Sequence, residues 1–261
     1  MKYFEIVKLK ETPIICNIPH SSIEIPPEFK KDFSLSQREL KLEIKRLADL
    51  YIDSFFSNLL NDHGGIISKV SRIVVDTERF SDDEKEPMSK VGMGAIYIKN
   101  EAGETIREID EARKQKLLTQ IYQPYHQALT KLTNDCLLQF NKCLILDCHS
   151  FPSEPRSYES DRNKDRPDIC LGTDEFHTSE ELKNIFFENF KLADFSIKIN
   201  SPFVETMVPE KFYQKNKNVS SIMIEINRKL YMDESTFTKN NVFDEVSDKI
   251  CMIIKESVES F

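Results

Sequence analysis

Four apolar stretches of the sequence run directly into side chains that can bind a metal ion or transfer a proton. The side chains that follow them are His20 and Ser21; Asp76, Glu78 and Arg79; Asp147, Cys148, His149 and Ser150; and Glu225 and Arg228. Neutral imidazole and carboxylate suit a zinc-like divalent ion, and a catalytic zinc takes three protein ligands while a fourth position binds water. His20, Asp76 and His149 could provide such a set, so the sequence predicts one metal site.

The spacing around His149 predicts which of its neighbours shares its face of a strand. Residues two apart in a strand point the same way, so Asp147 is expected to lie beside His149 and to orient its imidazole. Cys148 is expected to point to the opposite face. A cysteine hydrolase, with Cys148 as nucleophile and His149 as base, is therefore the less favoured alternative.

Each of these groups also has a purely structural interpretation. A histidine near a strand end is often a hydrogen-bonded core or surface residue, and Glu225 could be a buried carboxylate paired with Arg228. Asp76 could likewise form a local ion pair with Arg79. The coincidence of four such strand ends strengthens the functional interpretation.

The elements expected to position these residues form an α/β fold. Short β-branched runs alternate with longer helical patterns, which is typical of a mainly parallel sheet covered by helices on both faces. The expected strands are 14–18, 66–75, 143–146, 195–199 and 220–226, and the expected helices are 35–60, 104–140, 178–191 and 241–258. In such sheets ligands bind at the carboxyl ends of the strands, where the four polar groups should meet.

Two helices and two polar segments carry local signals. Ser36 and Glu39 have the spacing of a capping box for the first helix. Pro124 should interrupt or bend the second helix, because proline lacks an amide donor and clashes with the preceding turn. The polar segments 81–100 and 151–168 follow strands directly, and long loops at strand ends often form sites.

Composition limits the classes of protein to consider. The 261 residues fit one α/β domain over residues 1–261, and a net charge of -8 argues against a broad basic face for nucleic acid. None of the six glycines builds a phosphate-binding loop motif, and none of the six cysteines forms a C-x-x-C pair. With no signal-peptide pattern and no apolar run of about 20 residues, the sequence predicts a cytoplasmic protein with reduced thiols, which binds a small molecule and neither nucleic acid nor membrane. A monomer is expected, because no exposed apolar stripe is evident.

Six blocks of this sequence closely resemble the N-formylglutamate amidohydrolase family and occur in the family's order. The blocks are residues 18–21, 71–80, 86–88, 147–152, 167–174 and 221–231. They include the sequences Ile18-Pro19-His20-Ser21, Asp147-Cys148-His149-Ser150-Phe151-Pro152 and Ile224-Glu225-Ile226-Asn227-Arg228. A match of several blocks, spread from about residue 14 to residue 235, is far more specific than any single short motif.

The resemblance implies a three-layer α/β/α fold akin to the zinc exopeptidases and a metal-dependent amidohydrolase that uses one Zn²⁺. The implied reaction cleaves the amide of N-formyl-L-glutamate, or of a related N-acyl amino acid, to formate and the amino acid, a step of histidine degradation. Carried over residue by residue, the resemblance implies that His20, His149 and Asp76 bind the metal and that Glu225 is the general base. Glu78 stands where the family often has asparagine, so it competes with Asp76 as the acidic ligand.

Other side chains are candidates for contacts with the substrate. Arginine binds carboxylate bidentately, so Arg79 and Arg228 are expected to hold the carboxylates of the substrate, unless they pair with Asp76 and Glu225 instead. His126 also resembles a family element and could donate to the oxyanion or remain a core histidine. Weaker candidates for substrate contacts are Ser150, Tyr97 and Tyr231.

Two further functions stay open at this point. The same scaffold could bind a small acid or a metal without turnover, in which case Glu225 would be merely structural. The reaction could also act on a different substrate, such as a longer N-acyl amino acid or a peptidoglycan-derived amide.

Overall fold

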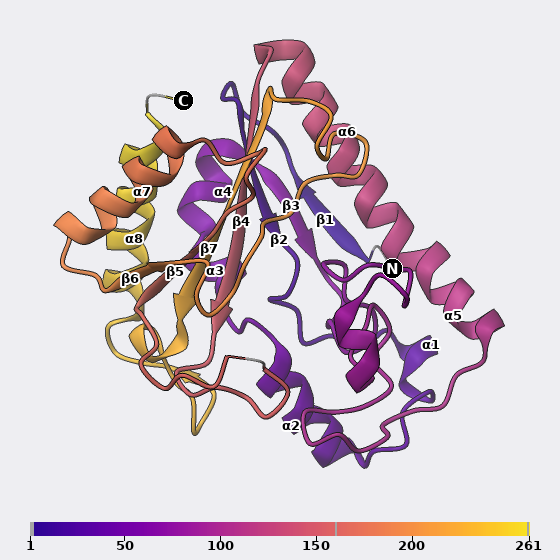
Figure 1. Cartoon of the computed structure of the whole chain (residues 1–261). Helices are drawn as coiled ribbons and strands as arrows, with labels where there is room; N and C mark the ends of the chain where they lie inside the picture. The colour runs from indigo at the N-terminus through magenta and orange to yellow at the C-terminus, as the bar shows by residue number, and fades with distance from the viewer. Residues whose placement is uncertain (1–2, 160, 260) are drawn as a thin grey trace.

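A seven-stranded sheet organises the computed structural model, which describes residues 3–159, 161–259 and 261 (Figure 1). The strands, in the order β1-β3-β2-β4-β7-β5-β6 across the sheet, are β1 (Phe4–Val7), β2 (Ile14–Ile18), β3 (Gly65–Ser68), β4 (Cys143–Phe151), β5 (Ile169–Gly172), β6 (Ile197–Ile199) and β7 (Val219–Asn227). Strands β3, β2, β4 and β7 run parallel, β1 is antiparallel to β3, and β5 is antiparallel to β7. A separate hairpin pairs β8 (Met232–Asp233) with β9 (Thr238–Lys239). The expected α/β class, with a mainly parallel mixed sheet, is confirmed.

Helices cover both faces of this sheet (Figure 1). The helices are α1 (Pro27–Lys30), α2 (Gln37–Leu47), α3 (Ile52–Phe55), α4 (Ser57–His63), α5 (Glu111–Leu117), α6 (Gln123–Phe140), α7 (Glu180–Leu192) and α8 (Phe243–Val258), with short turns η1 (Pro87–Val91), η2 (Leu118–Tyr122) and η3 (Arg228–Leu230). On one face, Leu129 of α6 packs with Ile15 and Ile145. On the other face, α4, α7 and α8 pack with the alternate residues of the same strands, such as Leu146. Among the described residues, no helix is both long and apolar enough to cross a membrane.

The expected helix 35–60 is wrong in its middle. The chain forms α2, α3 and α4 instead, and residues 48–51 are not helical, with Tyr51 at a left-handed φ of 69°. In this break the backbone N–H of Asp49 donates to the carbonyl of His20 at 2.9 Å. A contact between remote segments therefore overrides the local helical pattern at this point.

Two local signals at helix ends are confirmed. Ser36 and Glu39 form a capping box at the start of α2. The second long helix begins at Glu111, and a π-helical turn, Leu118–Tyr122, precedes α6. Pro124 lies in the first turn of α6 and has no N–H to donate, so the expected interruption takes the form of this π-helical turn.

The expected strand 66–75 is wrong in its second half. Strand pairing ends at Ser68, and the apolar residues that follow are buried in a cluster with residues of α1, α2 and α5. Buried Arg107 donates Nη2 to the carbonyls of Ile73 and Val74, at 2.9 Å each. The apolar pattern thus reflects burial, and a side chain supplies the hydrogen bonds that a neighbouring strand would have made.

Strand β4 continues past its expected end at residue 146 and stays paired with β7 through Phe151. Asp147 and His149 therefore lie inside the sheet, and strand pairing holds their backbone. Cys148 points to the opposite face and is buried in the apolar core there, as the spacing predicts. All six cysteines are buried as free thiols. The separation of Cys148 from His149 argues against the cysteine-hydrolase alternative.

Replacing Gly65 by alanine should destabilise the pairing of β3 with β2, the strand that leads to His20. A Cβ atom at Gly65 would lie 2.1 Å from the carbonyl oxygen of Cys16, so the two strands would have to separate. We expect Gly65→Ala to cost about 3 kcal/mol and to lower the thermal midpoint by roughly 6–12 °C. The control is Gly103→Ala, where a Cβ would meet no atom within 4 Å and the positive φ alone costs about 1 kcal/mol. Equal shifts of the two midpoints, measured by circular dichroism, would contradict this account.

Candidate metal and catalytic site

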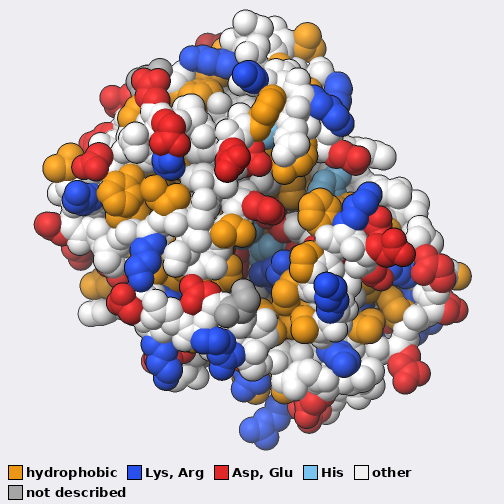
Figure 2. Space-filling model, viewed as in Figure 1, with side chains coloured by type: hydrophobic (Ala, Val, Ile, Leu, Met, Phe, Trp, Pro, Cys, Tyr) orange, Lys and Arg blue, Asp and Glu red, His pale blue; other side chains and the backbone are white. Residues whose placement is uncertain are grey.

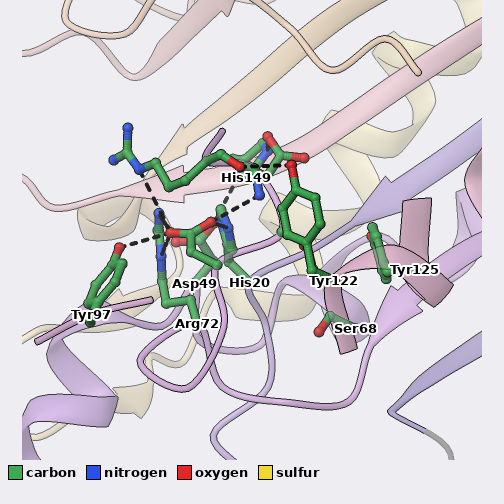
Figure 3. A network of polar contacts seen from close by, with 12 residues as sticks. His20, Asp49, Ser68, Arg72, Tyr97, Tyr122, Tyr125 and His149 are labelled. Carbon is green, nitrogen blue, oxygen red and sulfur yellow. Dashed lines mark hydrogen bonds and ion pairs between the residues drawn. The ribbon is translucent and has the colours of Figure 1, made fainter. Parts of the chain in front are cut away.

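The two histidines that the sequence singles out lie against each other, and both face Asp49 (Figure 3). His20 follows β2 and His149 lies in β4; their ring centroids are 5.0 Å apart and both side chains are buried. Oδ2 of Asp49 is 3.8 Å from Nδ1 of His20 and 3.2 Å from Nδ1 of His149. These three groups converge closely enough to hold one metal ion.

Carboxylates hold the opposite edges of the two imidazole rings. Nε2 of His20 lies 2.8 Å from Oδ1 of Asp76, and Nε2 of His149 lies 3.0 Å from Oδ1 of Asp147. Asp147 thus lies beside His149 on the same face of β4, as the spacing predicts. A carboxylate behind a metal-binding histidine sets the orientation of its ring. Both Nδ1 atoms are therefore directed toward Asp49.

The Nδ1 atom of His20 is the clearest sign that this group fits a metal ion. Because Asp76 is ionised, the proton of the neutral His20 ring lies on Nε2, which donates to Asp76. Nδ1 then carries a lone pair, and it is buried without a hydrogen-bond partner. A buried nitrogen lone pair that faces a carboxylate and a second imidazole fits a zinc-like ion.

Asp49 is the member of this group that sequence reasoning missed. In a helix running from residue 35 to residue 60 it would lie on the polar face, so the pattern carried no signal for it. Nη2 of Arg228 donates to its Oδ1 at 3.0 Å, which leaves Oδ2 for the histidines. Burial would raise the pKa of Asp49, but His149, His20 and Arg228 hold it below its usual value. The carboxylate is therefore ionised, as a metal ligand must be.

Asp76 reaches the site but occupies the far side of His20. Its Oδ2 accepts from Nε and Nη2 of Arg72, at 3.0 and 2.7 Å, and from the Tyr97 hydroxyl at 2.8 Å (Figure 3). Its Oδ1 accepts from His20 and from the backbone N–H of Glu78. Burial would raise the pKa of Asp76, but Arg72 and His20 hold it well below its usual value. With both oxygens engaged, Asp76 orients His20, and Asp49 occupies the place expected for Asp76 between the two Nδ1 atoms.

Glu78 lies near the Nε2 edge of His149 rather than near Asp49. Its Oε2 is 3.4 Å from Nε2 of His149, and its Oε1 accepts from Nδ2 of Asn17 at 2.8 Å. The same Asn17 amide donates to Asp147, and its Oδ1 accepts from the hydroxyl of Tyr125 in α6. Glu78, Asp147 and His149 form a second converging group, which shares His149 with the first.

Glu225 lies beside His149 in the sheet. The two residues are in register on the paired strands β7 and β4, so their side chains project from the same face. Oε2 of Glu225 is buried without a hydrogen-bond partner. Burial, assisted by the charge of Asp49 and opposed by His149 and Arg228, raises the pKa of Glu225 to about 8. A carboxyl group that exchanges a proton near neutral pH is suited to general acid and base chemistry.

Arg228 holds Asp49 directly, and Ser150 and Tyr231 bond to the groups around it. Arg228 donates Nη2 to Asp49, Nη1 to the carbonyl of Arg46 at 2.9 Å and Nε to Oγ of Ser150 at 3.3 Å. Tyr231 is fully buried and its hydroxyl donates to the carbonyl of Leu50. These three side chains, expected to contact substrate, have their polar atoms engaged in the interior. Tyr97, bound to Asp76, is engaged in the same way.

Arg79 differs from Arg228 because its guanidinium is only loosely paired. Its nearest carboxylate oxygens, from Asp76 and Glu86, are 3.9 and 3.7 Å away, and its side chain is 29% exposed. Its Nε is buried without a hydrogen-bond partner. Figure 2 shows that the surface is hollowed where histidine side chains are visible, with basic, acidic and hydrophobic side chains around the hollow. Of the two expected arginines, Arg79 retains donors for a ligand.

His126 does not join the converging group. Its Nε2 lies 2.8 Å from the carbonyl oxygen of Thr77, so the ring donates its proton to the backbone there. Arg72, which sequence reasoning did not single out, is linked to His20 through its bonds to Asp76. No periodic pattern of residues marked Arg72 as different from the other basic residues of its segment.

Comparison with known proteins gives one family. A family model described as N-formylglutamate amidohydrolase matches residues 12–232, a range that includes the converging histidines, Asp49 and Glu225. A Pseudomonas putida protein named N-formylglutamate deformylase is 23% identical over 236 residues, which are 85% of this chain and 83% of that protein.

Two solved structures share the fold. The crystal structure of an N-formylglutamate amidohydrolase from Ralstonia eutropha JMP134 has a TM-score of 0.81 at 20% identity, over 97% of this chain and 96% of that chain. The structure of a gene product from Agrobacterium tumefaciens has a TM-score of 0.70 at 17% identity, over 100% of this chain and 96% of that chain.

Replacing Asp76 by asparagine should destabilise the protein strongly, because Arg72 would lose its charged partner in the interior. Breaking a buried ion pair on one side costs about 3–5 kcal/mol. The matched control is Asp62→Asn, because Asp62 pairs with Lys255 at 2.5 Å but is 48% exposed, and such pairs contribute at most about 1 kcal/mol. Urea unfolding at pH 7 measures both losses. Comparable losses for the two variants would show that the buried pair of Asp76 and Arg72 stabilises the protein no more than an exposed pair does.

Proposed function

The chain belongs to the N-formylglutamate amidohydrolase family, and from this premise we propose that it is a zinc-dependent amidohydrolase acting on N-formyl-L-glutamate or a related N-acyl amino acid. The observation that carries the proposal is the unpaired Nδ1 of His20, directed with Nδ1 of His149 toward Asp49, beside a buried Glu225. We further propose that the protein acts as a cytoplasmic monomer on a small molecule, in the degradation of histidine.

We assign the metal to His20, Asp49 and His149. Two imidazoles and one carboxylate are a donor set that zinc prefers, and Asp76 and Asp147 would orient the two rings. When bound, the ion would act as a Lewis acid toward the substrate carbonyl and toward water. Burial lowers the pKa of His149, but Asp147 and Glu78 outweigh it and raise the pKa well above its usual value. In the protonated ring, the N–H at Nδ1 of His149 donates a hydrogen bond to Asp49. Metal binding at this nitrogen would therefore release that proton.

Glu225 is the general base of this proposal. Its carboxylate accepts a proton from the attacking water as the water oxygen bonds to the formyl carbon. The same carboxyl group then gives that proton to the amide nitrogen while the carbon–nitrogen bond breaks, which yields formate and the free amino acid. A buried carboxyl with a raised pKa can perform both transfers, and a divalent cation nearby would favour its ionised form.

Arg79 is the proposed binding group for a substrate carboxylate. Arg228 is committed to Asp49, so it is assigned a supporting role. The buried, unpartnered Nε of Arg79 and its loose ion pairs leave a forked donor available. The net charge of -8 is no obstacle, because the field at a site depends mainly on the charges close to it.

The first test measures formate release from N-formyl-L-glutamate by the purified protein, with metal content determined on the same sample. We expect a chelator to remove zinc and abolish release, and added zinc to restore both. Bound zinc without formate release would indicate that the substrate is another N-acyl compound. Formate release that is indifferent to the chelator would refute the metal-dependent mechanism.

Two substitutions separate the proton-transfer role from the metal-binding role. Glu225→Gln should lower kcat by about 10³-fold and leave zinc content unchanged, because the amide cannot accept the proton. Asp49→Asn should weaken zinc binding by at least about tenfold while it keeps an acceptor for Arg228. Asp53→Asn, a nearby aspartate whose side chain accepts from the backbone of Ser54, is the control and should change neither quantity. An active Glu225→Gln variant would leave Glu225 with a structural role.

A further inference from the structure

Two side chains hold the backbone of the segment that carries Arg79. Tyr122, at the end of the π-helical turn, donates its hydroxyl to the carbonyl of Arg79 at 3.0 Å. His126, one helical turn later in α6, donates Nε2 to the carbonyl of Thr77 at 2.8 Å. The two carbonyls flank Glu78. Because both bonds end on main-chain atoms, they hold the path of the chain and occupy no side-chain atom of Arg79.

Tyr122 and His126 also hold each other. They are four residues apart and therefore lie on one side of the helix, with ring centroids 4.2 Å apart and an angle of 32° between the ring planes. Burial lowers the pKa of His126, so its ring is neutral and its one N–H is the one given to Thr77. Partly buried rings in contact lose little freedom when they make these hydrogen bonds, so the pair is preorganised.

The segment that these residues hold has no regular secondary structure. On its other side, the N–H of Glu78 donates to Asp76 and the N–H of Phe80 donates to Glu86. Without a neighbouring strand, such side-chain bonds decide where the backbone of Arg79 lies. The guanidinium itself is loosely paired, so its position depends strongly on that backbone.

We propose that Tyr122 and His126 are positioning residues that hold the 77–79 backbone so that Arg79 presents its donors to a substrate carboxylate. The proposal rests on the proposed function, because it takes Arg79 as the group that binds substrate. It assigns to His126 a role different from the catalytic one expected from the sequence, since its N–H is directed at the backbone of Thr77.

The test uses Tyr122→Phe and His126→Phe in the full-length, zinc-loaded protein. Each variant keeps an aromatic ring for stacking and removes one hydrogen bond to the segment. We expect KM for N-formyl-L-glutamate to rise about fivefold in each variant, while kcat and zinc content stay within about twofold. Tyr213→Phe, at a tyrosine that is 41% exposed, is the matched control and should leave KM unchanged.

Repeating the Tyr122→Phe measurement in a protein that lacks the Arg79 guanidinium distinguishes positioning from a general loss of structure. In an Arg79→Gln protein, Tyr122→Phe should raise KM no further, because the group that it positions is already gone. An equal rise in KM in both backgrounds would overturn the proposal. Hydrogen exchange at the amides of Glu78 and Phe80 should also become about tenfold faster in Tyr122→Phe, and unchanged exchange would overturn the proposal as well.

These measurements separate this proposal from the proposed function. If the parent protein releases no acid from N-formyl-L-glutamate or from related N-acyl amino acids, the proposed function fails, and the affinity for glutarate, measured by calorimetry, then replaces KM. Weaker glutarate binding in Tyr122→Phe that disappears in the Arg79→Gln background would still support the positioning role. Glutarate affinity that is unchanged by Tyr122→Phe, or no glutarate binding by the parent protein, would overturn it.

Discussion

The hydrogen bond between Asp76 and Nε2 of His20 determines what the site can hold. It places the proton of the neutral ring on Nε2, so the unprotonated Nδ1 faces Asp49. Arg72 and the Tyr97 hydroxyl keep Asp76 ionised and in place, and Asp147 holds Nε2 of His149 in the same way. Rotating either imidazole would direct the wrong atom at Asp49. The polar groups behind the histidines are therefore as necessary to the donor set as the histidines themselves.

Burial gives each acidic group of the site a different character. Asp49 and Asp76 are each bound by an arginine and remain ionised well below neutral pH. Oε2 of Glu225 has no such partner, so desolvation raises its pKa to about 8. A charged group without a partner is costly to bury, and it responds by binding a proton more readily. The same interior thus contains carboxylates suited to hold a cation and one suited to carry a proton.

Paired strands and irregular segments contribute differently to this arrangement. His149 and Glu225 lie on β4 and β7, where the register of two long parallel strands sets their separation. Asp49, Asp76 and Arg79 come from segments without strand or helix structure. Hydrogen bonds from Arg228 and Arg72 to carboxylates, and from Arg107 and Tyr122 to backbone carbonyls, hold those segments. The strands provide a rigid base, and buried polar side chains adapt the loops to it.

The sequence by itself determined what depends on neighbours along the chain. The two-residue period of a strand placed Asp147 beside His149 and turned Cys148 away, and β-branched runs located β2 and β7 to within one residue at each end. Asp49 could not be found this way, because the local pattern continues a helix through it. The helix is broken where the Asp49 N–H donates to the carbonyl of His20, and Arg228 donates to the Asp49 carboxylate and directs it. The bond of Asp76 to Nε2 of His20 likewise joins residues far apart in the sequence. Periodicity is a local property of the backbone, whereas the pairing of buried charges depends on segments that meet only after folding.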